Sequence, residues 1–191
     1  MTSTTRLWLV RHGQTDWNLA GRYQGQADIP LNETGRQQAQ TLAASLAGVA
    51  FDAVYSSDLS RAHQTALALT RPLGTLIRLE PRLREIHQGE WEGMLLSEIR
   101  AARSDGGTPH HDSTHWRAPG GESVIEVAAR VAKAADEISR RFPGGQVLVV
   151  GHGLCLATLI CQSRGLPLAC VYEHVPENCA PVEIAWPPTR S

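Results

Sequence analysis

Three short apolar runs, each bounded by turn residues, predict buried strands at residues 7–10 (LWLV), 53–55 (AVY) and 147–150 (VLVV). Weaker runs near 76–79 and 182–186 predict two further strands. The apolar residues in the strong runs are continuous rather than alternating, which is typical of strands that are covered on both faces. The pattern therefore indicates a sheet with a layer of structure on each side.

Helical periodicity fills the intervals between these strands. The predicted helices run from a cap at Asn32 to Gly48, from about Leu59 to Arg71, over 124–141, and from Gly153 onward. Ser123 and Glu126 have the spacing of a capping box at the start of the third helix. Strands that alternate with helices of this length favour a three-layer α/β/α fold around a mostly parallel central sheet.

The 191 residues are expected to form a single domain spanning 1–191. The segment 103–121 shows no periodicity and is rich in Gly, Pro, His and Asp, so we expect a long, lid-like loop there.

A net charge of −1 gives no general reason for binding nucleic acid or an anionic membrane. No apolar run approaches the ~20 residues of a membrane span, and the four cysteines lack C-x-x-C spacing. We therefore expect a cytoplasmic protein with reduced thiols and neither a nucleic-acid nor a membrane partner.

Two of the predicted strands end in nearly the same sequence. Arg11-His12-Gly follows the strand at 7–10, and Gly-His152-Gly follows the strand at 147–150. The carboxyl ends of parallel strands meet at one edge of a sheet, so both histidines should lie at that edge. A third strand leads through SSD to Arg61, at the start of a helix. Guanidinium groups and helix N-termini both attract oxyanions, and the combination predicts a phosphate site.

Several catalytic signatures are absent from the chain. It has no P-loop, no G-x-S-x-G, no H-E-x-x-H, and no Cys followed five residues later by Arg. Walker-type nucleotide hydrolysis, serine hydrolysis, zincin chemistry and cysteine-based phosphatase chemistry therefore lose their usual support.

Five segments in order carry a resemblance to a known family. They read LVRHGQTDWN at 9–18, SDLSRAHQTA at 57–66, LREIHQGEWEG at 83–93, PGGES at 119–123 and VVGHG at 149–153. Together the sequence resembles the histidine phosphatase superfamily, the phosphoglycerate mutase-like proteins. The resemblance implies a phosphoglycerate mutase-like fold and a phosphohistidine mechanism that uses neither a metal nor another cofactor.

The resemblance also implies a role for each matched residue. His12 would be the nucleophile that becomes phosphorylated, while Arg11, Arg61 and His152 would bind the phosphoryl oxygens. Glu85 would protonate the leaving oxygen and then activate water. Further phosphate contacts would come from Asn18, Gln24, Gly25 and Gly153.

Judged from the residues alone, Glu85 could instead form a salt bridge with Arg82 or Arg84. The competitors for the acid role are Glu90, Glu92 and Glu122, the last of which we expect to be structural. Asp16 and Asp58 are expected to be caps or turn residues.

The text after Glu85 departs from the mutase pattern, which continues with a Tyr, a Lys and paired Arg. We therefore expect a phosphomonoester hydrolase acting on a small metabolite, such as α-ribazole phosphate, a sugar phosphate or a phosphoglycerate derivative. Two alternatives are a phosphoglycerate mutase and a non-catalytic phosphate-binding module. Trp91 and Trp116 could contact the substrate beyond its phosphate.

Two further features of the sequence concern possible partners. The histidine-rich loop, with His110, His111, Asp112 and His115, could bind a divalent metal, although a solvated loop is the expected reading. Edge strands and the C-terminal segment could pair with a second subunit, and a homodimer is consistent with the resemblance.

Overall fold

The computed structural model describes residues 4–71, 74–102 and 114–187 of the chain. The strands are β1 (Thr5–Arg11), β2 (Ala53–Ser56), β3 (Ile77–Leu79), β4 (Gln146–Gly151) and β5 (Pro181–Trp186). The helices are α1 (Asp16–Leu19), α2 (Glu33–Ser45), α3 (Ser60–Thr70), α4 (Leu96–Ala102), α5 (Val124–Arg141) and α6 (Gly153–Ser163). Three 3-10 helices are η1 (Pro81–Leu83), η2 (Gly89–Trp91) and η3 (Leu168–His174).

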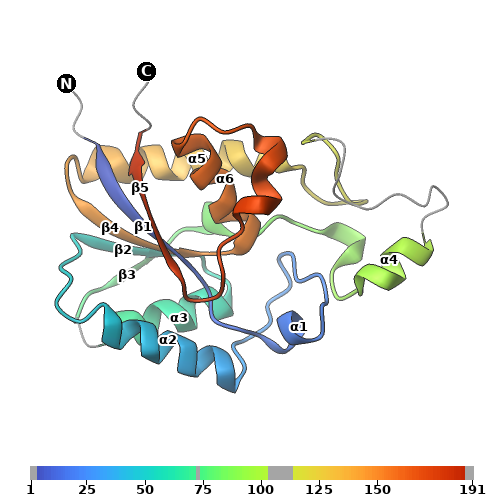
Figure 1. The fold of residues 1–191 in the computed structure, drawn as a ribbon, viewed down its shortest axis with the longest axis horizontal. Helices are drawn as coiled ribbons and strands as arrows, with labels where there is room; N and C mark the ends of the chain where they lie inside the picture. The colour runs from blue at the N-terminus through green and yellow to red at the C-terminus, as the bar shows by residue number, and fades with distance from the viewer. Residues whose placement is uncertain (1–3, 72–73, 103–113, 188–191) are drawn as a thin grey trace.

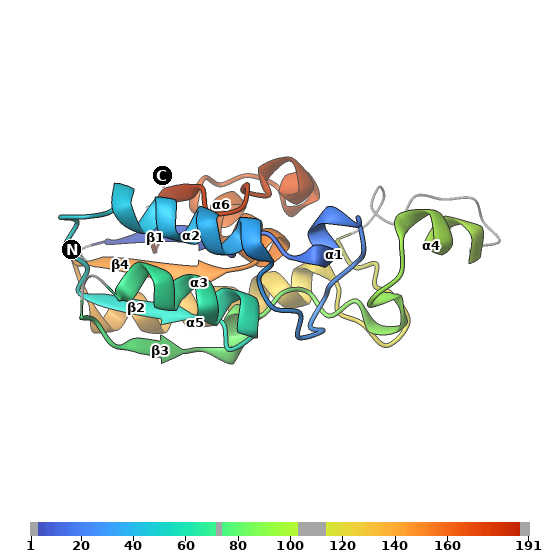
Figure 2. The same ribbon diagram turned by 90° about the horizontal axis from the view of Figure 1, so that it is seen from below.

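The strands form one sheet in the order β3-β2-β4-β1-β5, in which only β5 is antiparallel to its neighbour. Helices α5 and α6 cover one face of this sheet and α2 and α3 cover the other (Figure 1). Seen from below, α1 and α4 lie beyond the end of the layered body (Figure 2). The predicted three-layer α/β/α fold is confirmed.

Alternate residues of the central strands enter two separate cores. On β1, Leu7 and Leu9 face the cluster formed with α5 and α6, whereas Val10 packs with α2 and α3. The side chains of strand β4 alternate between the two cores in the same way, and both faces of the sheet are buried. This two-sided burial accounts for the continuous apolar runs in the sequence.

The helix signals in the sequence act as predicted. Asn32 accepts the Gly35 N–H at 2.9 Å at the start of α2, and Ser123 with Glu126 forms the capping box of α5. Helix α2 ends at Ser45, three residues before Gly48. The sequence pattern missed α1, α4 and η3, which are too short for helical periodicity to be distinct.

The four cysteines are free thiols in the structure, and two of them, Cys155 and Cys161, are buried. Within the described ranges, no helix combines the length and the apolar character needed to cross a membrane. Residues 103–113 of the predicted lid-like loop lie outside the described residues. The rest of that segment contains turns and a bridge between Arg117 and Ser123.

Candidate active site

The strand register brings the two histidines together. Arg11, the last residue of β1, pairs with Gly151, the last residue of β4, so His12 and His152 leave adjacent strands at the same level. Their ring centroids are 5.1 Å apart. Ser57 follows β2 on the other side of β4, and its hydroxyl lies 2.9 Å from His152 Nε2. The centre of the site is therefore formed by residues at the carboxyl ends of three adjacent strands, β2, β4 and β1.

His12 is held in one tautomer. Its Nδ1 lies 2.7 Å from the carbonyl oxygen of Gly13, which can only accept, so Nδ1 carries the proton. The Nε2 atom then has a free lone pair and accepts the Nε–H of Arg61 at 3.3 Å. Burial lowers the pKa of His12 well below its ordinary value, and the positive charge of Arg61 lowers it further. The buried ring is therefore neutral near pH 7 and has a nucleophilic nitrogen.

His152 is fully buried and is also neutral, because burial and the charge of Arg61 both lower its pKa well below the ordinary value. Its Nδ1 has no hydrogen-bond partner among the described residues. A buried polar atom without a partner is costly in a folded protein, so this Nδ1 is a candidate contact for a ligand.

Among the described residues, Arg61 is the largest fully buried side chain, and it comes from the first turn of α3. It donates to the carbonyl oxygens of Ala27 at 2.7 Å and Gly25 at 2.8 Å, in addition to His12. Burial lowers its pKa to about 10, so the guanidinium stays charged at neutral pH. A buried cation bonded only to neutral groups favours an anionic ligand.

Arg11 lies against the first residue of α6. A Cβ atom on Gly153 would be 3.5 Å from the Arg11 guanidinium carbon, and Arg11 donates to the Pro176 carbonyl at 3.0 Å. Its Nε is buried without a hydrogen-bond partner in the described structure. Burial lowers the pKa of Arg11, and the charge of Glu85 partly opposes this. A second cation therefore faces the N-terminus of a helix, where oxyanions are stabilised.

The alternative of a salt bridge from Glu85 to Arg82 or Arg84 is wrong. Arg82 binds Glu80 and Glu137, and Arg84 binds Asp58. The Glu85 carboxylate instead accepts the N–H groups of Leu154 at 3.2 Å and Cys155 at 3.0 Å, in the first turn of α6. It also accepts the N–H of Ile86 at 3.0 Å. Glu85 is therefore placed at the same helix end as Arg11. We call the group formed by Arg11, His12, Arg61, Glu85 and His152 the two-histidine cluster.

The competing acidic residues are exposed or bound to other groups. Glu90 is exposed, Glu92 accepts the backbone N–H groups of Gln26 and Gln88, and Glu122 binds Arg130. Asp58 lies in the bend between β2 and α3, as predicted for a turn residue, and its carboxylate also forms a bidentate pair with Arg84. Asp16 begins α1, but the cap is Thr15.

Asn18, Gln24 and Gly25, in the segment after His12, contact Thr15 and Arg61. The Asn18 side-chain oxygen accepts the Thr15 N–H at 3.1 Å, and the Gln24 oxygen lies 2.9 Å from the Thr15 hydroxyl. The Gly25 carbonyl holds Arg61. Gly25 has a φ of +50°, and a Cβ there would be 2.2 Å from Glu92 Oε1, so a larger residue would displace this support.

The structure places Trp91 and Trp116, the residues predicted to contact the substrate beyond its phosphate, beside α4. Their rings stack on each other with centroids 4.9 Å apart, and Trp91 belongs to a small core with Ile99 of α4 and Ala118. Both rings thus pack on the outer segment around α4, and their contact with the substrate stays a prediction.

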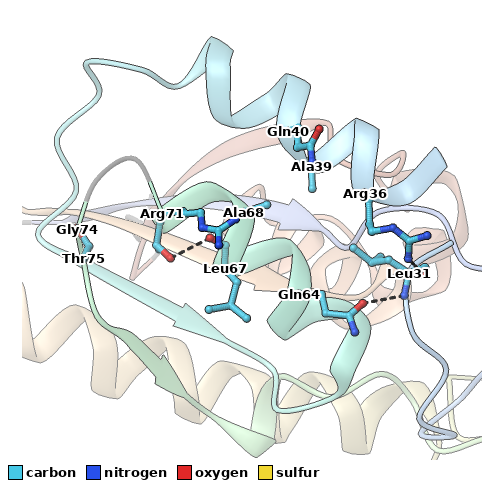
Figure 3. A pocket seen from close by; sticks show the side chains of 11 residues that line it. Leu31, Arg36, Ala39, Gln40, Gln64, Leu67, Ala68, Arg71, Gly74 and Thr75 are labelled. Carbon is cyan, nitrogen blue, oxygen red and sulfur yellow. Dashed lines mark hydrogen bonds between the residues drawn. The ribbon is translucent and has the colours of Figure 1, made fainter. Parts of the chain in front are cut away.

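Among the described residues, no group of three or more His, Cys, Asp or Glu side chains is placed to hold a metal ion. His110, His111 and Asp112 of the candidate metal loop lie outside these residues. A groove of about 590 Å³ lies between α2 and α3 (Figure 3), and none of the two-histidine cluster lines it. Two of its lining residues bind each other, since the Gln64 side-chain oxygen accepts the Leu31 N–H at 3.0 Å.

Sequence reasoning missed several residues that hold the cluster in place. Thr65 accepts the Gly13 N–H at 3.0 Å, Asn178 donates to the His12 carbonyl at 2.6 Å, and Arg130 donates to the Glu85 carbonyl at 2.8 Å. Each lies far from its partner in the sequence, and no local pattern distinguishes it from an ordinary polar residue.

Comparison with known proteins agrees with this arrangement. The family model of the histidine phosphatase superfamily (branch 1) matches residues 7–190. A protein described as probable phosphoglycerate mutase GpmB, from Photorhabdus laumondii, is 39% identical over 164 residues, which cover 85% of this chain and 76% of the relative. Glucosyl-3-phosphoglycerate phosphatase from Mycobacterium tuberculosis is 38% identical over 172 residues, covering 86% of this chain and 77% of that protein.

The structure is similar to that of the alpha-ribazole phosphatase from Shigella flexneri, with a TM-score of 0.84 and 29% identity over 93% of this chain and 89% of that one. The predicted enzyme class, a phosphoric monoester hydrolase, is confirmed by the family model and the phosphatase relatives. The family resemblance drawn from the five motifs is confirmed as well, and the chain belongs to the histidine phosphatase superfamily.

Proposed function

We propose that this enzyme hydrolyses its phosphomonoester in two steps, through a phosphohistidine on Nε2 of His12. The observation that carries the proposal is the neutral, buried imidazole, whose Nδ1–H donates a hydrogen bond to the Gly13 carbonyl and whose Nε2 lone pair faces Arg61. A nitrogen in this state can attack phosphorus without first losing a proton.

In the first step, Nε2 of His12 forms a bond to phosphorus while the ester P–O bond breaks. The departing oxygen takes a proton from the carboxylic acid form of Glu85. In the second step, water attacks the phosphorus of the phosphohistidine and gives a proton to the Glu85 carboxylate. The Nε2–P bond breaks at the same time and inorganic phosphate is released. The acid is thereby restored, and each step is balanced in protons.

The charge of the transferring phosphoryl group would be held by this chain's own cations. Arg11 and Arg61 bring two guanidinium groups, and His152 brings the unpartnered Nδ1. The N–H of Gly153 adds the start of α6. This preorganised set stabilises the charge of the transition state without a metal ion.

Asn18, Gln24 and Gly25 would complete the phosphate site. The oxygens of both amide side chains are already engaged with Thr15, so each amide would present its NH₂ group to the substrate. The Gly25 carbonyl orients Arg61, which leaves its N–H as the group able to meet an anion.

We propose a small phosphorylated metabolite as the substrate. The named relatives support this, since one acts as a glucosyl-3-phosphoglycerate phosphatase and another as an alpha-ribazole phosphatase. The candidates are therefore a phosphoglycerate derivative, a sugar phosphate and α-ribazole phosphate. The relative described as a probable phosphoglycerate mutase makes intramolecular transfer the competing reaction.

The test is hydrolysis of para-nitrophenyl phosphate with a chelator present, followed by the three metabolite classes. We expect release of inorganic phosphate by the wild type and none by His12→Asn, while His63→Asn, a histidine of α3 outside the cluster, stays active. Conversion of phosphoglycerate to its isomer without phosphate release would favour the mutase. Turnover that survives in His12→Asn would overturn the proposal.

A further inference from the structure

Arg130, on α5, uses every N–H of its guanidinium outside the phosphate site. Its Nε and Nη2 each donate to the Glu122 carboxylate at 2.8 Å. Nη1 donates to the carbonyl oxygens of Arg82 at 2.7 Å and Arg84 at 2.8 Å, and Nη2 also donates to the Glu85 carbonyl at 2.8 Å. One side chain thus fixes the main chain that leads into the proposed acid.

Glu122 holds the same segment from the other side. Its carboxylate accepts the N–H of His87 at 2.9 Å, while its own N–H donates to the His87 carbonyl at 2.9 Å. Gln26 adds a further bond, because its amide donates to the Glu85 carbonyl at 3.1 Å. The peptide before and after Glu85 is therefore bracketed by the ion pair of Arg130 and Glu122.

Both members of this pair are charged. Burial acts to raise the pKa of Glu122, but the hydrogen bonds from Arg130 and His87 outweigh it and lower the pKa. Burial acts to lower the pKa of Arg130, and the hydrogen bonds to Glu122 raise it above its ordinary value. A half-buried ion pair contributes little net stability, because desolvation offsets the attraction. Its contribution is to positioning, because four acceptor groups, one carboxylate and three carbonyls, are arranged around one planar guanidinium group.

The Glu85 side chain is held independently by the first turn of α6, through Leu154 and Cys155. Its main chain and its carboxyl group are therefore fixed by two different elements. We propose that Arg130, with Glu122 as its counter-ion, is a positioning residue that sets the place of the Glu85 carboxyl group for proton transfer to the leaving oxygen. This inference rests on the proposed function, because it needs Glu85 to act as the acid.

The test exploits the leaving group. para-Nitrophenolate departs without protonation, whereas an alkoxide needs the proton of Glu85, so only alkyl phosphates depend strongly on the acid. The readout is kcat/KM, which reports the steps up to departure of the leaving group. Arg130→Lys keeps the charge but gathers its donors on one nitrogen, which cannot reach all four acceptors. We expect kcat/KM for ethyl phosphate to fall about 10–100-fold more than for para-nitrophenyl phosphate.

Three comparisons isolate the effect. Glu85→Gln should show the same selective loss for the alkyl substrate, and the double variant with Arg130→Lys should lose little more, because both changes disable one function. Glu122→Gln is a second route to the same defect, should Arg130→Lys fail to fold. Glu137→Gln is the matched control, since it removes an ion pair to Arg82 between the same two elements without touching Glu85.

Thermal unfolding of each variant shows whether it is folded at the assay temperature. Equal losses for the aryl and alkyl substrates in folded Arg130→Lys and Glu122→Gln would overturn the inference and leave the proposed function standing. If the wild type hydrolysed neither substrate, or His12→Asn hydrolysed both, the proposed function would fail first and this inference with it.

Discussion

Mild acid should destabilise this protein through its two buried histidines. His12 and His152 are 2% and 0% exposed, and burial holds the pKa of each well below 6.5. In the unfolded chain both rings would titrate near 6.5. Below that pH the unfolded state binds protons that the folded state does not, so the free energy of unfolding decreases as the pH falls.

The size of the effect follows from the two protonation states. A histidine whose folded ring stays neutral throughout costs about 2 kcal/mol at pH 5 relative to pH 7.5, so the upper limit for the pair is about 4 kcal/mol. This is a large part of the ~5–15 kcal/mol that holds a typical domain together. The carboxylates of Asp58, Glu80 and Glu122 have lowered pKa values, so their contributions are lost at lower pH, below this window.

The assay is urea unfolding followed by tryptophan fluorescence at pH 7.5, 6 and 5, in buffers free of phosphate. The wild type should become less stable as the pH falls, by up to about 4 kcal/mol across this range. A double variant, His12→Gln with His152→Gln, lacks both titrating groups and should lose much less. Parallel curves for the two proteins would show that the acid sensitivity does not arise from His12 and His152.

Three substitutions give further expected outcomes. Gly35→Ala should lower the free energy of unfolding by about 1–3 kcal/mol in urea unfolding, since its Cβ would lie 2.1 Å from the Gln14 carbonyl oxygen. The same variant should have lower activity in a phosphatase assay. Ser57→Ala removes the 2.9 Å partner of His152 and should cost ~1–3 kcal/mol and reduce kcat/KM, against unchanged values if this contact is idle. Leu148→Ala, in the fully buried middle of β4, should cost about 2–5 kcal/mol in urea unfolding with KM retained.

The layered fold was predictable because its signals are local. The runs at 7–10 and 147–150 are apolar at every position, and the structure buries them on both faces. Ser123 and Glu126 mark the start of α5 within four residues. Helix α4 lacked such a signal, because among the side chains described for its seven residues only Ile99 is fully buried, which gives no clear period.

The proximity of the two histidines was predictable for the same reason, since topology alone brings the ends of adjacent parallel strands together. The partners of charged side chains were not. Asp58 pairs with Arg84, 26 positions away, and Arg130 binds the main chain at Glu85, 45 positions away. Such contacts depend on how helices and loops pack, which sequence spacing does not encode.

The central claim is that the phosphoryl group passes through Nε2 of His12. The direct test is to mix the enzyme with a fast substrate, quench it in alkali, where phosphohistidine survives, and map the modified residue by mass spectrometry. We expect one phosphoryl group on His12 in the wild type, more of it in Glu85→Gln with an aryl phosphate, and none in His12→Asn. A turning-over wild type with no phosphorylated His12, or with the phosphoryl group on another residue, would contradict it.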